Sequence, residues 1–99
     1  MRRLEIHPEA YLEVEEARAW YESHGPTLGE DFLNAIEQAV SAIERAPEAW
    51  PIHSERVRRF LVHRFPFAIL YRHEEAKIQI IAVAHQRRRP GYWKNRQFD

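Results

Sequence analysis

The stretch from Arg56 to Trp93 reads RVRRFLVHRFPFAILYRHEEAKIQIIAVAHQRRRPGYW and decides the fold. Apolar β-branched and aromatic residues cluster in three short runs, Phe60–Val62, Phe67–Tyr71 and Ile78–Val83, each bounded by charged or turn-forming residues. Runs of this length and composition are typical of β-strands. The stretch therefore predicts three successive strands followed by a basic tail.

The residues before this stretch predict one more strand and the first of two helices. Arg3–His7 alternates polar and apolar residues, as a short strand does. Pro8 suits the first turn of a helix, because its missing N–H has no intrahelical partner there. Apolar residues then recur at helical spacing up to Tyr21, and Gly25 and Pro26 end the helix.

A second helix is predicted after a short link of residues 23–26. Thr27–Glu30 has the form of a capping box, in which the Thr27 hydroxyl and the Glu30 carboxylate cap each other's backbone N–H groups. Apolar residues follow at helical spacing from Phe32 to Ile43, and Ala46-Pro47 ends the helix. We expect residues 48–55 to form a loop into the sheet. The link of residues 23–26 between the two helices is so short that it forces them into an antiparallel hairpin.

The predicted order is β-α-α-β-β-β, an α+β fold of one domain, residues 1–99, with a helical hairpin packed on a mainly antiparallel four-stranded sheet. A turn centred on residues 75–76 would place Tyr71 opposite Ile80 and Leu70 opposite Ile81. Both faces of such a sheet are largely apolar, which exceeds what a sheet covered on one side requires. We therefore expect a second polypeptide to cover part of the face that lies opposite the helices.

The chain is neutral overall, but its charges are unevenly distributed. Residues 1–50 carry four arginines and eleven acidic residues, whereas residues 51–99 carry eleven basic and four acidic residues. This asymmetry favours a basic face for an anionic target, although the two halves could instead neutralise each other in the fold. Thirteen of the fifteen cations are arginine, which favours bidentate contacts with phosphate or carboxylate.

Composition excludes several classes of protein. The chain has no cysteine, so it forms no disulfide and no thiolate metal site. A hydrophobic share of 44% argues against disorder, and no apolar run approaches the ~20 residues of a membrane span. The N-terminus lacks the apolar stretch of a secretory signal. We expect a cytoplasmic protein that does not enter a membrane.

The most suggestive chemical cluster is His85-Gln86-Arg87-Arg88-Arg89, followed by Tyr92 and Trp93. Cleavage of RNA by its own 2′-hydroxyl needs a base, a cation for the phosphorane and an acid for the leaving oxygen. His85, Arg87 and Tyr92 are the candidates for these three catalytic roles. The alternative is that the histidine caps a strand end, the arginines face solvent, and the tail aromatics pack on the body.

Other chemistries find no support in the sequence. The six histidines include no HxH or HExxH spacing, so no metal ligand set is predicted. The three serines, Ser23, Ser41 and Ser54, lie in no nucleophile turn. With glycine only at residues 25, 29 and 91, no phosphate-binding loop is possible. We expect the protein to work without a cofactor or a metal.

The whole pattern resembles the RelE/ParE superfamily of toxins from type II toxin–antitoxin modules. The similarity begins with the helix motif around Glu16, Ala17, Ala19, Trp20 and Tyr21 and continues through Ala46-Pro47 and Val57–Phe60. Its most specific parts are Arg64–Tyr71, which contains FPFAILY, and Ile80–Trp93, which contains AVAHQRRRPGYW. The resemblance implies a toxin that a cognate antitoxin neutralises by wrapping around it, in a hetero-oligomer.

The superfamily divides by target, and the resemblance is closer to its ParE-like branch, which poisons DNA gyrase. RelE-like members instead cleave mRNA on the ribosome without a metal. Ala68 stands where those nucleases place an arginine, and Arg58 or Arg59 falls where they place lysines, although a guanidinium cannot serve as a base. His85, Arg87 and Tyr92 would be catalytic only in a nuclease.

We therefore predict a ParE-like toxin that arrests growth by binding gyrase, with an mRNA endonuclease as the alternative. A third class, a nucleic-acid-binding partner protein whose basic strip holds phosphate, also fits the charge pattern. The target is expected to contact a set of basic and aromatic side chains: Arg58, Arg59, Arg87, Arg88, Arg89 and Trp93.

Overall fold

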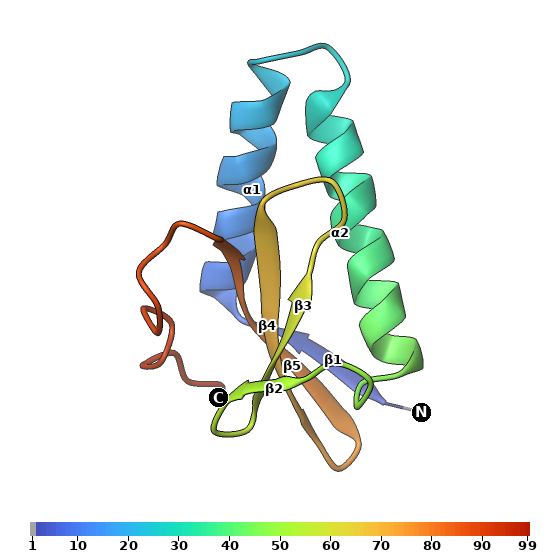
Figure 1. Cartoon of the computed structure of the whole chain (residues 1–99), viewed down its shortest axis with the longest axis vertical. Coiled ribbons are helices and arrows are strands. Elements are labelled where there is room, and N and C mark those ends of the chain that lie inside the picture. The colour runs from blue at the N-terminus through green and yellow to red at the C-terminus, as the bar shows by residue number, and fades with distance from the viewer. Residues whose placement is uncertain (1) are drawn as a thin grey trace.

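The computed structural model describes residues 2–99 as a five-stranded sheet with a helical hairpin against one of its faces (Figure 1). The elements in chain order are β1 (Arg3–Ile6), α1 (Pro8–Glu22), α2 (Leu28–Arg45), β2 (Ile52–Ser54), β3 (Val57–Leu61), β4 (Phe67–Glu74) and β5 (Lys77–His85). The predicted α+β class and the order of its elements are confirmed. Neither helix within residues 2–99 is long and apolar enough to cross a membrane.

The strands lie in the order β1-β5-β4-β3-β2, and only the β1–β5 pair is parallel. The prediction of four strands was wrong by one, because residues 52–54, expected in a loop, pair with β3 as an edge strand. β2 has three residues, follows Pro51 and changes register against β3. A segment this short and irregular carries no period-2 pattern that a sequence could display.

The helices begin where the sequence predicts, but one of the predicted caps is wrong. Pro8 occupies the first helical turn of α1, and the His7 ring accepts a hydrogen bond from the Glu9 N–H at 3.1 Å. Thr27 does precede α2, but its side chain makes no capping hydrogen bond. The Thr27 hydroxyl donates to the Asp31 carboxylate at 3.4 Å instead, so the capping box with Glu30 does not form.

The principal core lies between the hairpin and the sheet. α2 contributes a buried stripe that includes Phe32, Ile36, Ala39 and Ile43. Strands β4 and β5 contribute the facing side chains Phe67, Ile69, Tyr71, Ile78, Ile80 and Val83. Aromatic rings meet here in edge-on and stacked pairs, with Phe32 packed against Tyr21, Phe65 and Phe67. Burial of these large side chains supplies most of the apolar stabilisation of this layer.

A β-bulge in β5 changes which residues share a face. Tyr71 lies opposite Ile80, as predicted, but Leu70 lies opposite Ala82, with Ile81 as the extra residue. Ile81 and Ala82 therefore both belong to the face away from the helices, and Val83 turns toward the helices. The predicted pairing of Leu70 with Ile81 was therefore wrong by one residue.

The second face of the sheet is covered by the chain itself. Residues 91–99, here called the strap, cross this face and carry Trp93, Tyr92 and Phe98 onto it. In Figure 1 the strap continues from the end of β5 at the left of the sheet and runs down to the C-terminus. Beneath it lie Val57, Ala68, Leu70, Ile81 and Ala82, all buried. The strap therefore shields these residues from water, and the expectation that a second polypeptide covers part of this face stays a prediction.

Candidate functional site: an arginine-lined groove

A groove of about 130 Å³ lies between β3 and the strap, and we call it the basic groove. Its floor is formed by the small or apolar side chains Ala68, Leu70 and Ala84. The full lining is His53, Arg59, Ala68, Leu70, Ala84, His85, Gln86 and residues 88–93. The described residues that line the groove include no acidic side chain, so the groove attracts anionic groups.

The turn that follows β5 places the arginines at this groove. β5 ends where His85 pairs with Phe67, and the Gln86 N–H then donates to the Pro66 carbonyl at 2.9 Å. The Arg88 N–H closes a turn on the His85 carbonyl at 2.9 Å. Gly91 has a φ of +77°, a conformation that glycine adopts without strain, and it redirects the chain into the strap.

The predicted target-binding residues do not all lie together. Arg59, Arg88, Arg89 and Trp93 line the basic groove, whereas Arg87 is exposed outside its lining. Among the described residues 2–99, no salt bridge engages Arg59, Arg88 or Arg89. Their guanidinium groups are therefore free to pair with a partner's carboxylates or phosphates.

Arg58 and Trp93 hold the fold together in this structure. The Arg58 side chain points to the helical side of the sheet and donates to the carbonyls of Glu48 and Trp50, at 3.2 and 2.7 Å. It thereby fastens the segment between α2 and β2 to β3. Trp93 is only 5% exposed, since its side chain packs against the second face of the sheet. Only a small part of Trp93 borders the basic groove.

The three candidate catalytic residues are not arranged as a catalytic set. His85 and Tyr92 line the groove, but Arg87 does not. The His85 Nδ1 accepts a hydrogen bond from the Arg87 N–H at 3.0 Å, so its lone pair is engaged. The Tyr92 hydroxyl donates to the Glu13 carboxylate at 2.6 Å. Burial first, and then this hydrogen bond, raise the pKa of Tyr92 well above its usual value.

Sequence analysis missed the residue that organises this region, Glu13 of α1. Its carboxylate accepts hydrogen bonds from Tyr92, from the Val83 N–H at 2.9 Å, and from Arg96 at 3.0 and 2.8 Å. Its position does carry a signal. Glu13 lies three residues after Ala10 and four before Ala17, at the margin of the buried stripe, where a carboxylate needs a partner.

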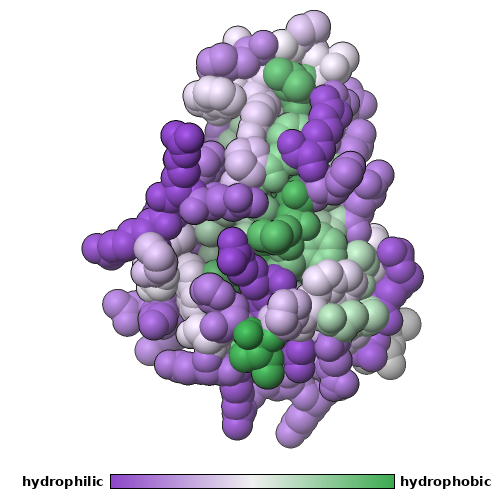
Figure 2. Space-filling model, viewed as in Figure 1, coloured by the Kyte–Doolittle hydropathy of each residue, from purple (hydrophilic) through white to green (hydrophobic). Residues whose placement is uncertain are grey.

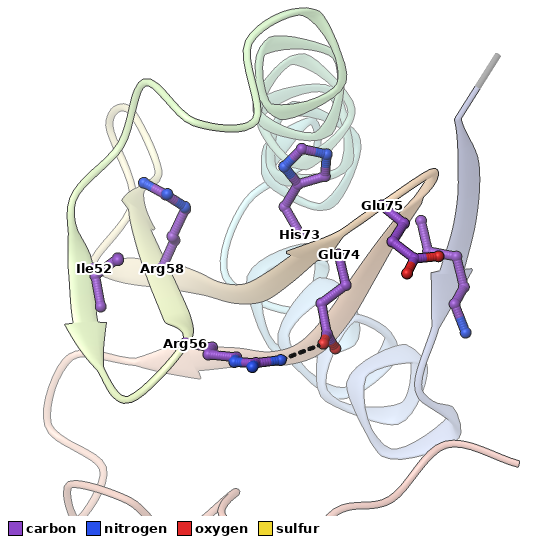
Figure 3. Close-up of a pocket in the computed structure, with 7 residues that line it drawn as sticks. Ile52, Arg56, Arg58, His73, Glu74 and Glu75 are labelled. Carbon is purple, nitrogen blue, oxygen red and sulfur yellow. Dashed lines mark hydrogen bonds and ion pairs between the residues drawn. The ribbon is translucent and has the colours of Figure 1, made fainter.

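A larger hollow lies elsewhere, at the end of the sheet where β4 turns into β5 (Figure 3). It measures about 540 Å³, and of the predicted residues it includes only Arg58. Two of its three cations are engaged, since Arg56 forms a salt bridge with Glu74 at 2.7 Å and Arg58 binds backbone carbonyls, and its lining also includes the acidic Glu74 and Glu75. This hollow therefore offers less to an anionic partner than the basic groove does.

Metal chemistry finds no ligand set in the structure. Within the part of the chain described, residues 2–99, no three histidine or acidic side chains lie close enough together to hold a metal ion. The basic groove itself contains His53 and His85 but no carboxylate. What the arrangement can do is bind an anionic, partly apolar surface.

These features define a class of protein: a small α+β fold with a helical hairpin on one face of the sheet and an arginine-lined groove on the other. A family model described as the ParE toxin of the type II toxin–antitoxin system parDE matches residues 4–90. The chain therefore belongs to the ParE toxin family. The predicted similarity to the RelE/ParE superfamily, and to its ParE-like branch, is confirmed.

Solved structures agree on the fold. One of the similar chains comes from the chromosomal ParDE toxin–antitoxin system of P. aeruginosa. It is 20% identical to the present chain, with a TM-score of 0.64, and the match covers 86% of this chain and 96% of that one. No curated protein matches the sequence closely enough to be counted as a relative.

Proposed function

We propose that this ParE-family toxin arrests growth by binding DNA gyrase through the basic groove, which implies a cytoplasmic location. The observation that carries the proposal is the contrast within the groove. The groups that would cleave RNA are engaged internally, His85 with the Arg87 N–H and Tyr92 with Glu13. The arginines beside them have no salt-bridge partner among residues 2–99. A groove with this chemistry suits binding better than proton transfer.

The aromatic residues of the groove also favour a protein target over unpaired nucleic acid. A base stacks on an open aromatic face. The Arg88 guanidinium already lies 3.8 Å from the Tyr92 ring centroid, and Trp93 is buried. Neither ring therefore presents a free face. An acidic protein surface with a small apolar contact matches both the free arginines and the apolar floor.

The purified toxin can be tested in a supercoiling and cleavage assay with gyrase. We expect the native chain to inhibit supercoiling and to trap cleaved DNA. The variant Arg59→Ala/Arg88→Ala/Arg89→Ala should lose about tenfold or more in potency, since each charged contact contributes on the order of 1 kcal/mol. Arg45→Ala, which removes an exposed arginine from the end of α2, is the matched control and should keep full potency.

The alternative is a ribosome-dependent mRNA endonuclease, for which the proximity of His85, Arg88 and Tyr92 in one groove is the supporting observation. The cellular effects of a nuclease differ from those of a gyrase poison. Induction of a nuclease would deplete messages first, whereas a gyrase poison gives filamentous cells with broken DNA and intact messages. Message cleavage that is lost in His85→Ala, together with unaffected gyrase, would overturn the gyrase proposal.

We further propose that a cognate antitoxin neutralises the toxin by covering the exposed apolar surface at the β2 edge. Ile52 and Leu61 are 57% and 56% exposed there, and Arg59 lies beside them in a hollow of about 440 Å³. In Figure 2, hydrophobic surface on this side of the molecule occurs as separate spots among hydrophilic side chains. An amphipathic segment with acidic residues would bury the apolar pair and neutralise the arginine.

Co-purification with the antitoxin tests this surface. Ile52→Asp/Leu61→Asp should weaken the complex, because it places charge in an apolar contact. Leu12→Asp makes the same chemical change at an equally exposed position on α1 and should leave the complex intact. If Leu12→Asp disrupts the complex and the double variant does not, the antitoxin binds the helical hairpin and the proposal fails.

A further inference from the structure

The strap, residues 91–99, lies outside the residues that the family model matches, which end at Pro90. It nevertheless forms part of the basic groove, because Tyr92 and Trp93 line it. The strap contains no helix or strand and is built of successive turns, so regular backbone pairing does not hold it in place. Its position must come from its side chains.

Trp93 packs on the second face of the sheet, and the polar side chains that hold the strap converge on Glu13. Arg96 makes a two-pronged contact with the Glu13 carboxylate, at 3.0 and 2.8 Å, and Tyr92 donates to the same group. The two charged side chains are only 12% and 13% exposed, so water screens the pair weakly. Phe98 completes the attachment by packing edge-on against the His7 ring, 5.4 Å between centroids.

Glu13 lies beside the part of β5 that β1 does not reach. β1 pairs with β5 only as far as Ile80, and beyond that point no strand formed by residues 2–99 borders β5 on this side. Glu13 accepts from the Val83 N–H, and Arg96 donates to the Ile81 carbonyl at 3.1 Å. One ion pair thus supplies the acceptor and the donor that another strand would have supplied.

The attachment reaches the arginines of the groove through Tyr92. Glu13 fixes the Tyr92 hydroxyl, and the Tyr92 ring supports the Arg88 guanidinium at 3.8 Å from its centroid. Stacking on an aromatic face restricts where a guanidinium can point. The position of Arg88 therefore depends on a carboxylate that never contacts the groove.

We propose that Glu13 is the positioning residue of the basic groove: by holding the strap against β5 through Arg96 and Tyr92, it sets the wall that presents Arg88 to a protein target. The inference rests on the proposed function only in naming what the groove binds. Loss of Glu13 loosens the strap at Tyr92 and Arg96 and shifts this wall of the groove, while Trp93 stays packed on the sheet and the sheet and helical hairpin keep their own core.

Hydrogen exchange on the full-length chain tests the attachment without any target. In Glu13→Ala the amides of residues 92–96 should exchange at least about tenfold faster, because two charged hydrogen bonds and the Tyr92 contact are lost together. Amides of β4 should keep their protection. Glu13→Gln, which retains an acceptor for Val83 but loses the charge, should fall between. Glu16→Ala, an exposed carboxylate of the same helix, is the matched control.

Gyrase inhibition then tests the positioning role. Tyr92→Phe keeps the ring under Arg88 but frees it from Glu13, and its potency should fall several-fold with the fold intact. Arg88→Met should lose potency without loosening the strap. Unchanged exchange in Glu13→Ala overturns the inference, and so does full potency in a variant whose strap is loose. If the native chain leaves gyrase unaffected, the proposed function fails, and the exchange measurement still decides whether Glu13 holds the strap.

Discussion

The Tyr92 hydroxyl donates a hydrogen bond to the Glu13 carboxylate, while the Tyr92 ring stacks against the guanidinium of Arg88. A tyrosine in a basic tail suggests an acid for RNA cleavage, but here the hydroxyl is turned away from the groove arginines toward a carboxylate. Desolvation and the bond to Glu13 both favour the neutral phenol. At the scale of single residues, the Tyr92 hydroxyl therefore serves to hold the structure together rather than to donate a proton in catalysis.

The raised pKa of Tyr92 predicts how stability depends on alkaline pH. The unfolded chain releases this proton near pH 10, whereas the folded protein retains it, so the folded state binds more protons and stability falls as pH rises above about 10. Chemical denaturation across this range should show a shallower fall in the free energy of unfolding for Tyr92→Phe than for the native chain. Burial also raises the pKa values of Tyr21 and Tyr71, so part of the dependence of the unfolding free energy on pH should remain in the Tyr92→Phe variant. Parallel curves would contradict the role given to Tyr92.

A second residue-scale prediction concerns Tyr71, whose buried hydroxyl donates to the Pro47 carbonyl at 2.6 Å. Tyr71→Phe leaves that carbonyl without its donor and should lower the free energy of unfolding by about 1–3 kcal/mol. Urea denaturation measures the change. Tyr11→Phe, at an exposed position on α1, should change stability by less than about 0.5 kcal/mol. Equal effects at both positions would show that the hydrogen bond contributes nothing.

At the scale of elements, the sequence predicted what periodicity and propensity encode. Both helices, the first strand and the three long strands follow from apolar spacing and from Pro8, Gly25 and Pro47. The edge strand at residues 52–54 was missed because pairing with β3, rather than its own pattern, makes it a strand. The bulge at Ile81 was missed for a related reason, since one inserted residue in an apolar run leaves the run unchanged.

The buried stripe of α2 supports a prediction at this scale. Phe32 is fully buried between the helices and the sheet, so Phe32→Ala should destabilise the fold by about 3–5 kcal/mol. Trp20→Ala removes a larger side chain from α1, but that side chain is 58% exposed, and it should cost less than half as much. Thermal or urea unfolding of the two variants compares them. A reversed order would mean that the hairpin packs differently.

For the molecule as a whole, the sequence predicted a basic face but not how the chain covers its own sheet. Of the six salt bridges described within residues 2–99, only Arg64–Asp31 and Arg96–Glu13 join the acidic half to the basic half. The two halves therefore neutralise each other only in part. The candidate groove was predictable as a concentration of arginines, whereas Glu13 became visible only when α1, β5 and the strap met in space.

This separation of charge predicts a salt dependence on the scale of the whole molecule. Binding of the target through the basic groove should weaken by about tenfold or more between low and high salt, because exposed arginines lose their attraction as the Debye length shortens. Stability should change little, because most of the ion pairs are exposed and contribute weakly. Titration calorimetry at several salt concentrations, alongside urea denaturation, measures both. Salt-independent binding would point to an apolar contact surface.

The unfinished border of β5 has a further consequence for solubility. Bare backbone along a strand recruits other chains and starts aggregates. Here two side chains from distant parts of the sequence bind the free backbone groups of β5: Glu13 accepts from the Val83 N–H, and Arg96 donates to the Ile81 carbonyl. Removing the side chain of Glu13 or of Arg96 should therefore expose backbone groups of β5 that other chains can pair with. The damage would appear first as self-association during expression, before any loss of fold could be measured.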